Sequence, residues 1–321
     1  MRAPEFWKTR RPSIRSVLLE PLSLVYRLAS GLRCLLNPCP YRPRIPVICV
    51  GGIAVGGSGK TPVAMEIAKI LGENRRTYCF LTKGYGGRSR GVLKLSEHNS
   101  SARIVGDEPL LLFERGDTFV SKNRVRGLKH IDSHYSYDHI IMDDGLQNPT
   151  FRKSKKILVL DCDSEFKSNS ILPAGPLRES FPSAVRRGID LAVLLGEDRN
   201  GIGELCDKYS IKVVRGVIKP KPLDFSGKCV ALCGIARPKK FEKTLVDCAV
   251  DFVDFISFED HHSYREGEIA ALEKAGYDIV TTRKDWVKIR DLNIDKSRIH
   301  VLEIFIDFAN PVALRETLLD S

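Results

Sequence analysis

The sequence lacks an uninterrupted apolar run that could cross a membrane. The apolar stretch at residues 17–36 contains Glu20, Arg27 and Arg33, whereas a membrane-spanning helix needs about 20 consecutive, mostly apolar residues. The same charges make this stretch a poor signal peptide. With 43% hydrophobic and 28% charged residues in 321, the composition is that of a soluble protein. The length predicts one large or two medium α/β domains with an ample core.

The cysteines lack the spacing of a zinc site or of a disulfide framework. There are nine, an odd number, scattered along the chain, and Cys229 and Cys233 stand four apart in what reads as a strand. This pattern predicts reduced thiols in the cytoplasm and gives no cysteine a metal or redox role.

Acidic residues are too few to balance the basic ones. The 51 Lys and Arg against 40 Asp and Glu give a net charge of +11 and a pI of about 9.2. This surplus indicates an anionic partner, and alone it leaves nucleic acid, a membrane and a phosphorylated substrate open. The surplus is concentrated at the start, because residues 1–44 contain nine basic and two acidic residues.

The same N-terminal region contains an amphipathic helix pattern. Helical spacing over residues 17–36 places Glu20, Ser23 and Arg27 roughly opposite an apolar face made of Leu18, Leu22, Val25, Ala29, Leu32 and Leu36. Such a helix with basic flanks can lie in a membrane interface and be attracted to anionic lipid. Packing on the protein's own core explains the pattern equally well.

Strand-like and helical segments alternate along the rest of the chain. Short apolar runs at 45–50, 77–82, 118–121, 139–143, 156–161 and 190–196 predict a P-loop doubly wound parallel sheet. A second βα series at 228–235, 252–258 and 278–282 predicts a second, smaller α/β domain. We place the two domains at 1–215 and 222–321, with residues 301–308 pairing with "KVVRGVI" as a two-stranded hinge before the last helix crosses back.

A glycine-rich turn at 50–61 is the clearest functional motif. It fits G-x-x-x-x-G-K-[ST], in which backbone N–H groups cradle nucleotide phosphates, the Lys reaches the β/γ-phosphates and the Ser or Thr binds Mg²⁺. The preceding strand and following helix supply the required setting. The candidate nucleotide-binding residues are Ala54, in place of the usual first glycine, Val55, Gly56, Gly57, Ser58, Gly59, Lys60 and Thr61. The alternative is a glycine-rich turn without a ligand.

Further motifs lie where strands or loops end. Asp143 and Asp144 follow the strand at 139–143, where P-loop enzymes place a Mg²⁺-holding carboxylate, although "DDG" is also a common turn. Asp107 begins an apolar helix, where an N-cap would suffice. Arg178 ends a stiff "LPAGPLRES" loop suited to an anion or only to a rigid turn. The histidine pair in "FEDHHSY" is, alone, as easily structural as catalytic.

Taken together these motifs resemble one family. The strings "PEFW", "VGGSGKTP", "KGYGG", "VGDEP", "DDGLQ", "LPAGPLRE", "GIARP", "FEDHH" and "TTRKD" are similar, in order, to the signatures of the tetraacyldisaccharide 4′-kinases of Gram-negative bacteria, from residue 4 to about 290. The family's small residue at the first P-loop glycine matches Ala54. Lys83 stands where the family usually has Arg, so it supplies a cation without the bidentate fork of a guanidinium.

The resemblance implies an ATP-dependent lipid kinase of lipid A biosynthesis. It would phosphorylate the 4′-hydroxyl of an acylated glucosamine disaccharide 1-phosphate at the cytoplasmic face of the inner membrane, an anionic surface, as a peripheral protein. It implies no nucleic acid and no obligate protein partner. ATP and Mg²⁺ are the implied cofactors.

The resemblance also assigns roles to residues of this sequence. Asp107 would take the hydroxyl proton, oriented by His261 in preference to His262. Lys60 would hold the β/γ-phosphates, and Thr61 with Asp143 and Asp144 the Mg²⁺. Lys83 and Arg178 would contact phosphate.

Two other classes use similar loops. A P-loop GTPase or metallochaperone would carry N-K-x-D, and the nearest string, "TRKD", has Arg283 in place of the Lys. A membrane-bound regulatory ATPase would carry an extra loop Lys where Val55 stands. Nucleotide preference and phosphate transfer to lipid, measured together, separate the three classes.

Overall fold

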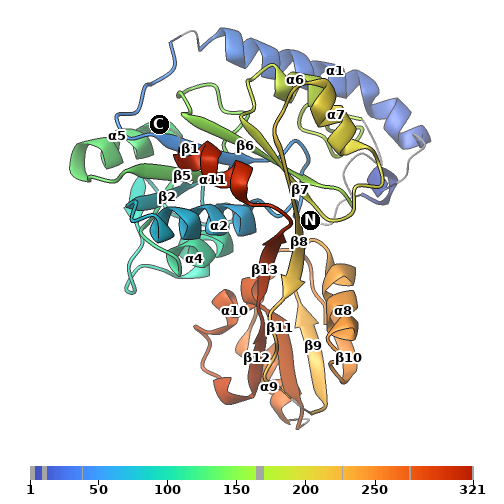
Figure 1. Cartoon of the computed structure of the whole chain (residues 1–321). Coiled ribbons are helices and arrows are strands. Elements are labelled where there is room, and N and C mark those ends of the chain that lie inside the picture. The colour runs from blue at the N-terminus through green and yellow to red at the C-terminus, as the bar shows by residue number, and fades with distance from the viewer. Residues whose placement is uncertain are drawn as a thin grey trace.

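The structure is a computed structural model that describes residues 4–8, 13–37, 39–163, 170–225, 227–274 and 276–319. It contains two sheets, one above the other in Figure 1. We call the nine-stranded sheet with its helices the larger domain and the four-stranded sheet with its helices the smaller domain. The α/β architecture with a second, smaller α/β domain was predicted from the sequence and is confirmed.

The larger sheet has the order β13-β8-β7-β6-β1-β5-β2-β4-β3. Its central pairs are parallel, and only β13–β8 and β3–β4 are antiparallel. The strands are β1 Val47–Gly51, β2 Tyr78–Thr82, β3 Val92–Lys94, β4 Thr118–Ser121, β5 His139–Asp143, β6 Lys155–Asp161, β7 Leu191–Leu195, β8 Val213–Pro220 and β13 Ile304–Phe308. The helices of this domain are η1 Glu5–Lys8, α1 Ile14–Leu35, α2 Lys60–Glu73, α3 Ala102–Val105, α4 Asp107–Phe113, α5 Arg124–His134, α6 Phe181–Val185, α7 Ile202–Lys208 and α11 Val312–Leu319.

The smaller sheet is parallel throughout, in the order β10-β9-β11-β12. Its strands are β9 Cys229–Cys233, β10 Phe252–Ser257, β11 Asp278–Thr282 and β12 Ile299–Leu302. The helices are α8 Pro238–Asp247, α9 Glu266–Lys274, α10 Arg283–Ile289 and η2 Lys296–Arg298. β8 and β13 run side by side at one edge of the larger sheet and extend toward the smaller domain (Figure 1), so the chain leaves and re-enters the larger domain through one antiparallel pair.

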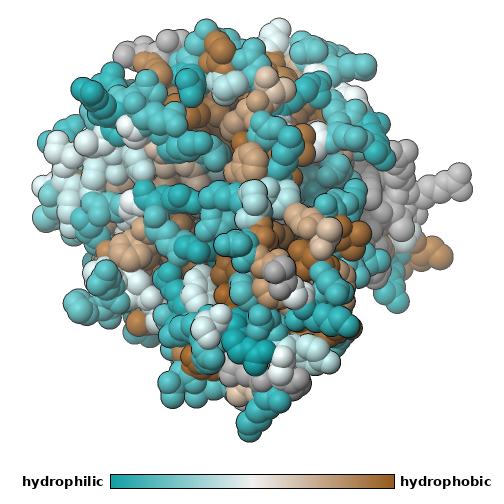
Figure 2. All heavy atoms as spheres, turned by 60° about the horizontal axis from the view of Figure 1, so that its bottom comes forward, coloured by the Kyte–Doolittle hydropathy of each residue, from teal (hydrophilic) through white to brown (hydrophobic). Residues whose placement is uncertain are grey.

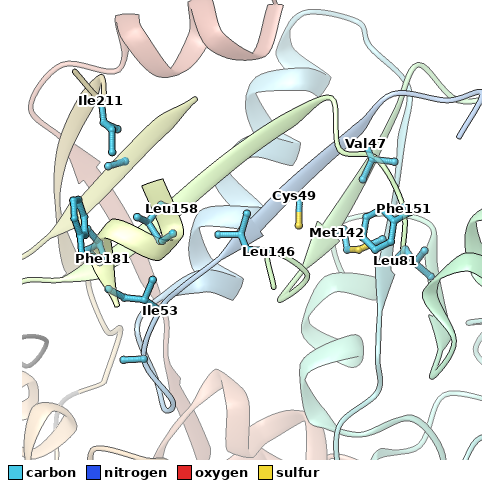
Figure 3. Packing of buried hydrophobic residues seen from close by; sticks show 14 of the residues in the cluster. Val47, Cys49, Ile53, Leu81, Met142, Leu146, Phe151, Leu158, Phe181 and Ile211 are labelled. Carbon is cyan, nitrogen blue, oxygen red and sulfur yellow. The ribbon is translucent and has the colours of Figure 1, made fainter. Parts of the chain in front are cut away.

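The larger sheet is covered on both faces, which is why its strands read as continuous apolar runs. Successive residues of β1 point to opposite sides: Val47 and Cys49 pack in one core with Met142, and Ile48 packs in the other. Figure 3 shows side chains of the first core, including Cys49, Met142 and Leu158. All nine cysteines lie in the described part of the chain, and none of them forms a disulfide.

Two expectations about strands need correction. Residues 301–308 do not form one strand: β12 pairs with β11 in the smaller sheet, and after Glu303 β13 pairs with β8 in the larger one. The predicted pairing of this segment with "KVVRGVI" is confirmed for β13. The sequence analysis also missed β3, a three-residue antiparallel edge strand whose only partner is β4 among the described strands.

Helix α1 lies along the outside of the larger domain (Figure 1). Its buried residues are two serines: the Ser23 hydroxyl donates to the Ile171 carbonyl at 2.8 Å, and the Ser16 hydroxyl donates to the Ala174 carbonyl. The apolar face points away from the protein, with Leu18 73% and Val25 61% exposed. Arg10 and Arg11, which contribute to the basic flank, lie outside the described residues.

Exposed apolar side chains concentrate on this helix. Half of the exposed large hydrophobic residues in the described chain belong to α1 or to Leu36 directly after it. On the face seen in Figure 2, by contrast, apolar residues occur as separate groups within a mainly hydrophilic surface. No helix in the described ranges is long and apolar enough to cross a membrane.

Candidate active site

The glycine-rich loop connects β1 to α2 at the carboxyl end of the larger sheet. Lys60 is the first residue of α2, and its ammonium donates to the Ser58 hydroxyl at 3.3 Å and to the Gly56 carbonyl at 3.4 Å. The ammonium therefore lies over the loop, where a phosphate group would be cradled by backbone N–H groups and the helix N-terminus.

The "LPAGPLRE" segment holds the start of this loop. The Val55 N–H donates to the Pro176 carbonyl at 2.9 Å, and the Arg178 N–H donates to the Ile53 carbonyl. Ala54 forms a bridge with Leu177 and is buried. The alanine at the first glycine position is thus accommodated, because its side chain is buried in the hydrophobic core of the larger domain.

Two carboxylates lie beside the loop at the end of the neighbouring strand, β5. The Thr61 hydroxyl donates to Oδ2 of Asp143 at 2.9 Å, because parallel β1 and β5 bring their carboxyl ends to one edge. Burial, followed by the charges of Glu108 and Asp144, raises the pKa of Asp143 to about 7. Its buried Oδ1 accepts no hydrogen bond from the described residues.

The second carboxylate, Asp144, is oriented toward cations. Arg178 forms an ion pair with it, and the Arg124 guanidinium donates to its backbone carbonyl at 3.3 Å. Burial raises the pKa of Asp144, but the positive charges of Lys60 and Arg178 outweigh burial and lower it. The structure therefore places Arg178 in an ion pair with Asp144, beside the carboxylates that end β5, and its anion-binding role stays a prediction.

These residues fit a magnesium ion that shares its coordination with phosphate. No group of three or more His, Cys, Asp or Glu side chains in the described ranges is arranged to hold a metal by itself. Mg²⁺ in phosphoryl-transfer sites, however, takes one or two carboxylates and completes its shell with waters and phosphate oxygens. The free Oδ1 of Asp143, beside the Thr61 hydroxyl, supplies such a ligand pair.

Asp107 and His261 meet at the contact between the two domains. Nδ1 of His261 lies 2.9 Å from both carboxylate oxygens of Asp107. Asp107 is 3% exposed and the His261 side chain 27%. Burial raises the pKa of Asp107, but the hydrogen bond with His261 and the charge of Lys284 outweigh burial and lower it to about 2. The structure thus brings these two predicted residues together.

The "KGYGG" and "VGDEP" motifs explain how Asp107 is presented. Asp107 follows Gly106, whose φ of +88° is left-handed, a conformation that favours glycine. A Cβ on Gly106 would lie 2.3 Å from the Tyr85 carbonyl oxygen, so the two loops need this close approach. The Tyr85 ring lies 5.3 Å from the His261 imidazole. Besides the His261 contact, Asp107 accepts the neighbouring Glu108 N–H at 3.0 Å.

Lys83 and His262, the remaining cation and histidine considered from the sequence, are not part of the Asp107–His261 contact. Lys83 follows β2, two strands from β1, and is exposed. His262 stacks on Phe258 with ring centroids 4.3 Å apart, and its Nε2 lies 3.2 Å from Glu268. The preference for His261 over His262 therefore agrees with the geometry.

Sequence reasoning missed a lysine at this site. Lys284 lies 3.0 Å from Asp260 and 3.7 Å from Asp107 through its ammonium. Burial lowers the pKa of Lys284, but the charges of Asp107 and Asp260 outweigh burial and raise it. The signal was present in "TTRKD", which was read as a family signature and as the string nearest to a guanine-reading motif, without a role for Lys284.

Ion pairs also join the two domains on both sides of the Asp107–His261 pair, which we call the dyad. On one side Glu114, directly after α4, accepts from Arg283 at 2.9 Å and from Arg290 at 2.7 Å. On the other side Arg237 of the "GIARP" segment and Lys240 of α8 pair with Asp161 at the end of β6. The second group adjoins the glycine loop, since a Cβ on Gly57 would lie 3.8 Å from the Ala236 methyl.

Comparison with known proteins identifies the family of this chain. A family model described as tetraacyldisaccharide-1-P 4′-kinase matches residues 15–321. The chain belongs to the tetraacyldisaccharide 4′-kinase family. The family member of Maricaulis maris is 35% identical over 334 residues, covering 100% of this chain and 96% of the relative. That of Paramagnetospirillum magneticum is 38% identical over 322 residues, covering 98% and 97%.

A solved structure extends the comparison to three dimensions. The crystal structure of LpxK from Aquifex aeolicus in complex with ATP matches with a TM-score of 0.75 at 26% identity, covering 95% of this chain and 98% of that one. The predicted membership of the tetraacyldisaccharide 4′-kinase family and its α/β fold are confirmed. Family members are kinases.

Proposed function

We propose that this tetraacyldisaccharide 4′-kinase homologue transfers the γ-phosphoryl group of ATP to the 4′-hydroxyl of tetraacyldisaccharide 1-phosphate, a step of lipid A biosynthesis. The observation that carries the proposal is the Asp107–His261 contact at 2.9 Å, which joins the smaller domain to the domain that carries the glycine-rich loop. The related Aquifex structure contains ATP.

The loop and its neighbours would position the nucleotide. Residues 54–61 act as a phosphate-binding P-loop, with the Lys60 ammonium against the β/γ-phosphates and Arg178 against a phosphate of nucleotide or lipid. Lys83 is proposed as a further phosphate contact. Phosphoryl transfer needs mainly positioning and charge neutralisation from a protein, and this cluster of cations offers both.

Thr61 and Asp143 would hold Mg²⁺, with Asp144 beside them. When bound, such an ion would neutralise the charge that develops on the phosphate during transfer. The chain's own contribution is a buried carboxylate oxygen without another partner in the described chain and a hydroxyl 2.9 Å from the same carboxylate.

Asp107 would accept the proton of the attacking sugar hydroxyl. The oxygen–hydrogen bond of the 4′-hydroxyl breaks toward the carboxylate as the new bond from oxygen to the γ-phosphorus forms and ADP leaves. A pKa of about 2 keeps Asp107 ionised at neutral pH, so the acceptor is always in its active form. His261 orients the carboxylate through Nδ1.

Helix α1 would place the enzyme on the membrane that holds its substrate. The helix turns its serines toward the protein and its leucines outward, which is the arrangement of an interfacial helix. Together with the basic N-terminal segment this favours peripheral binding to the anionic cytoplasmic face of the inner membrane. The enzyme would then reach its substrate while the acyl chains of that substrate remain in the bilayer.

The experiment that tests this function uses labelled nucleotide. Purified protein is incubated with [γ-³²P]ATP, Mg²⁺ and tetraacyldisaccharide 1-phosphate, and the lipids are separated by thin-layer chromatography. The proposal predicts a labelled bisphosphorylated lipid. Hydrolysis of ATP or GTP without labelled lipid would support a regulatory ATPase or a GTPase instead.

A further inference from the structure

A buried polar cluster lies next to the loop that carries His261. Asp285 is fully buried on α10, and Tyr264 is 7% exposed. The Tyr264 hydroxyl donates to Oδ1 of Asp285 at 2.9 Å, Lys288 pairs with the same oxygen at 2.8 Å, and the Thr282 hydroxyl donates to Oδ2 at 2.7 Å. A buried carboxylate that accepts two hydroxyl hydrogen bonds and forms an ion pair with an ammonium holds these neighbours in one arrangement.

The cluster is joined to His261 through the end of β9. The His261 N–H donates to the Gly234 carbonyl at 3.2 Å. A Cβ on Gly234 would lie 3.0 Å from the Tyr264 hydroxyl oxygen and 3.2 Å from Oδ1 of Asp285. The backbone of Gly234, which accepts the His261 N–H, therefore packs directly against the Tyr264–Asp285 hydrogen bond.

The backbone of His261 needs such support. Its φ is +62°, a left-handed conformation that is unfavourable for a non-glycine residue. A residue keeps this conformation only when its surroundings hold it there. In the described structure the Gly234 carbonyl accepts the His261 N–H, Nδ1 contacts Asp107, and Nε2 lies 3.5 Å from Asp260.

The same aspartate anchors the helix that approaches Asp107 from the other side. The Asp285 N–H donates to the Thr282 hydroxyl at 3.2 Å, which caps α10. The adjacent Lys284 lies 3.7 Å from Asp107. Asp285 thus connects the histidine loop and Lys284, the two parts of the smaller domain that reach Asp107.

We propose that Tyr264 and Asp285 are positioning residues for the dyad, and that their buried hydrogen bond sets the loop at residues 258–264 in the shape that directs Nδ1 of His261 to Asp107. Neither residue touches substrate. The inference rests on the proposed kinase function only for its kinetic readout.

Tyr264→Phe tests the proposal because it removes the hydroxyl and keeps the ring. Asp285 retains Lys288 and Thr282, so the fold loses one of three partners. We expect kcat to fall roughly tenfold or more, since a misplacement of about 1 Å can cost up to 10²-fold, while the KM for ATP changes less than about twofold. Tyr277→Phe, which alters a half-exposed tyrosine of the same domain, is the matched control and should leave kcat unchanged.

A comparison in two backgrounds separates positioning from general stability. In His261→Ala protein, Tyr264→Phe should lower kcat no further, because the hydroxyl acts through His261. An equal fractional loss of kcat in both backgrounds would overturn the proposal. Should Tyr264→Phe fail to fold, Gly234→Ala inserts a methyl 3.0 Å from the Tyr264 hydroxyl oxygen, and the same comparison applies.

A spectroscopic readout keeps this inference distinct from the kinase activity. The imidazole signals of His261, assigned by their loss in His261→Ala, are recorded in ¹H–¹⁵N spectra of the full chain. Tyr264→Phe should shift them and Tyr277→Phe should not, whether or not the protein phosphorylates lipid. Unchanged His261 signals in Tyr264→Phe would overturn the positioning role, whereas absent lipid labelling by the wild type would overturn only the proposed function.

Discussion

Asp107 and His261 are 154 residues apart in sequence and belong to different domains, yet Nδ1 of His261 lies 2.9 Å from the Asp107 carboxylate. The contact exists only because α4 of the larger domain faces α10 and the β10–α9 loop of the smaller one. The contact therefore depends on how the two domains sit together, and changes in either domain should affect the rate of phosphoryl transfer.

The first prediction concerns Lys60. Lys60→Ala should abolish lipid phosphorylation and leave the melting temperature nearly unchanged, because the ammonium lies over a loop at the surface and contacts only Ser58 and the Gly56 carbonyl among the described residues. Transfer of ³²P to lipid and a thermal melt check both parts. Retained activity at an unchanged melting temperature would remove the phosphate-binding role of the loop.

The second prediction concerns the membrane. Leu18→Ser with Leu22→Ser should weaken binding to anionic vesicles by roughly 10²-fold or more, since burying each exposed leucine in lipid is worth about 1.5–3 kcal/mol, and the melting temperature should change little. Cosedimentation with vesicles measures binding. Val246→Ser, at a side chain of α8 that is 62% exposed, is the control.

Charge contributes separately to this binding. Reversing Arg10, Arg11 and Arg15 to Glu, or deleting residues 1–36, should also weaken vesicle binding, because each basic residue near an anionic surface is worth roughly 1 kcal/mol. The charge reversal should matter less at high salt, where screening shortens the range of the field. Undiminished cosedimentation of the reversed protein at low salt would argue against an electrostatic contribution.

The third prediction is a pH dependence of stability. The pKa of Asp107 in the folded protein is about 2, below its ordinary 3.8, so the ionised carboxylate stabilises the fold above about pH 4 and this contribution disappears as the pH falls through about 2. The contribution is about 2 kcal/mol. Urea unfolding of the wild type and of Asp107→Asn should therefore differ most near pH 6 and converge toward pH 2. A difference independent of pH would contradict the strong pairing of Asp107.

Much of the fold could be read from the sequence because buried parallel strands are short, β-branched and apolar. The limits had physical causes. β3 has three half-buried residues at an edge, which leaves almost no pattern. The sequence of residues 301–308 looks like one strand. The chain nevertheless pairs with the smaller sheet before Glu303 and with the larger sheet after it.

The site was only partly predictable. The glycine loop and Asp143 follow from local motifs, whereas the Asp107–His261 pair came from the family resemblance, since no local pattern reports a contact across two domains. The direction of α1 was open because amphipathicity does not say which face packs. Two buried serines decided it. Lys284, Tyr264 and Asp285 matter through contacts that only the tertiary fold creates.

The most direct test of the account is the double-mutant comparison of Asp107→Asn, His261→Ala and the two combined, measured as kcat for lipid phosphorylation with the KM for ATP and the melting temperature. If the pair acts as one unit, each single variant should lower kcat by roughly 10² to 10⁴, the double variant should be little worse than either, and the KM for ATP should change much less. Multiplicative losses of kcat in the double variant, or near-normal kcat with a lowered melting temperature, would contradict the dyad.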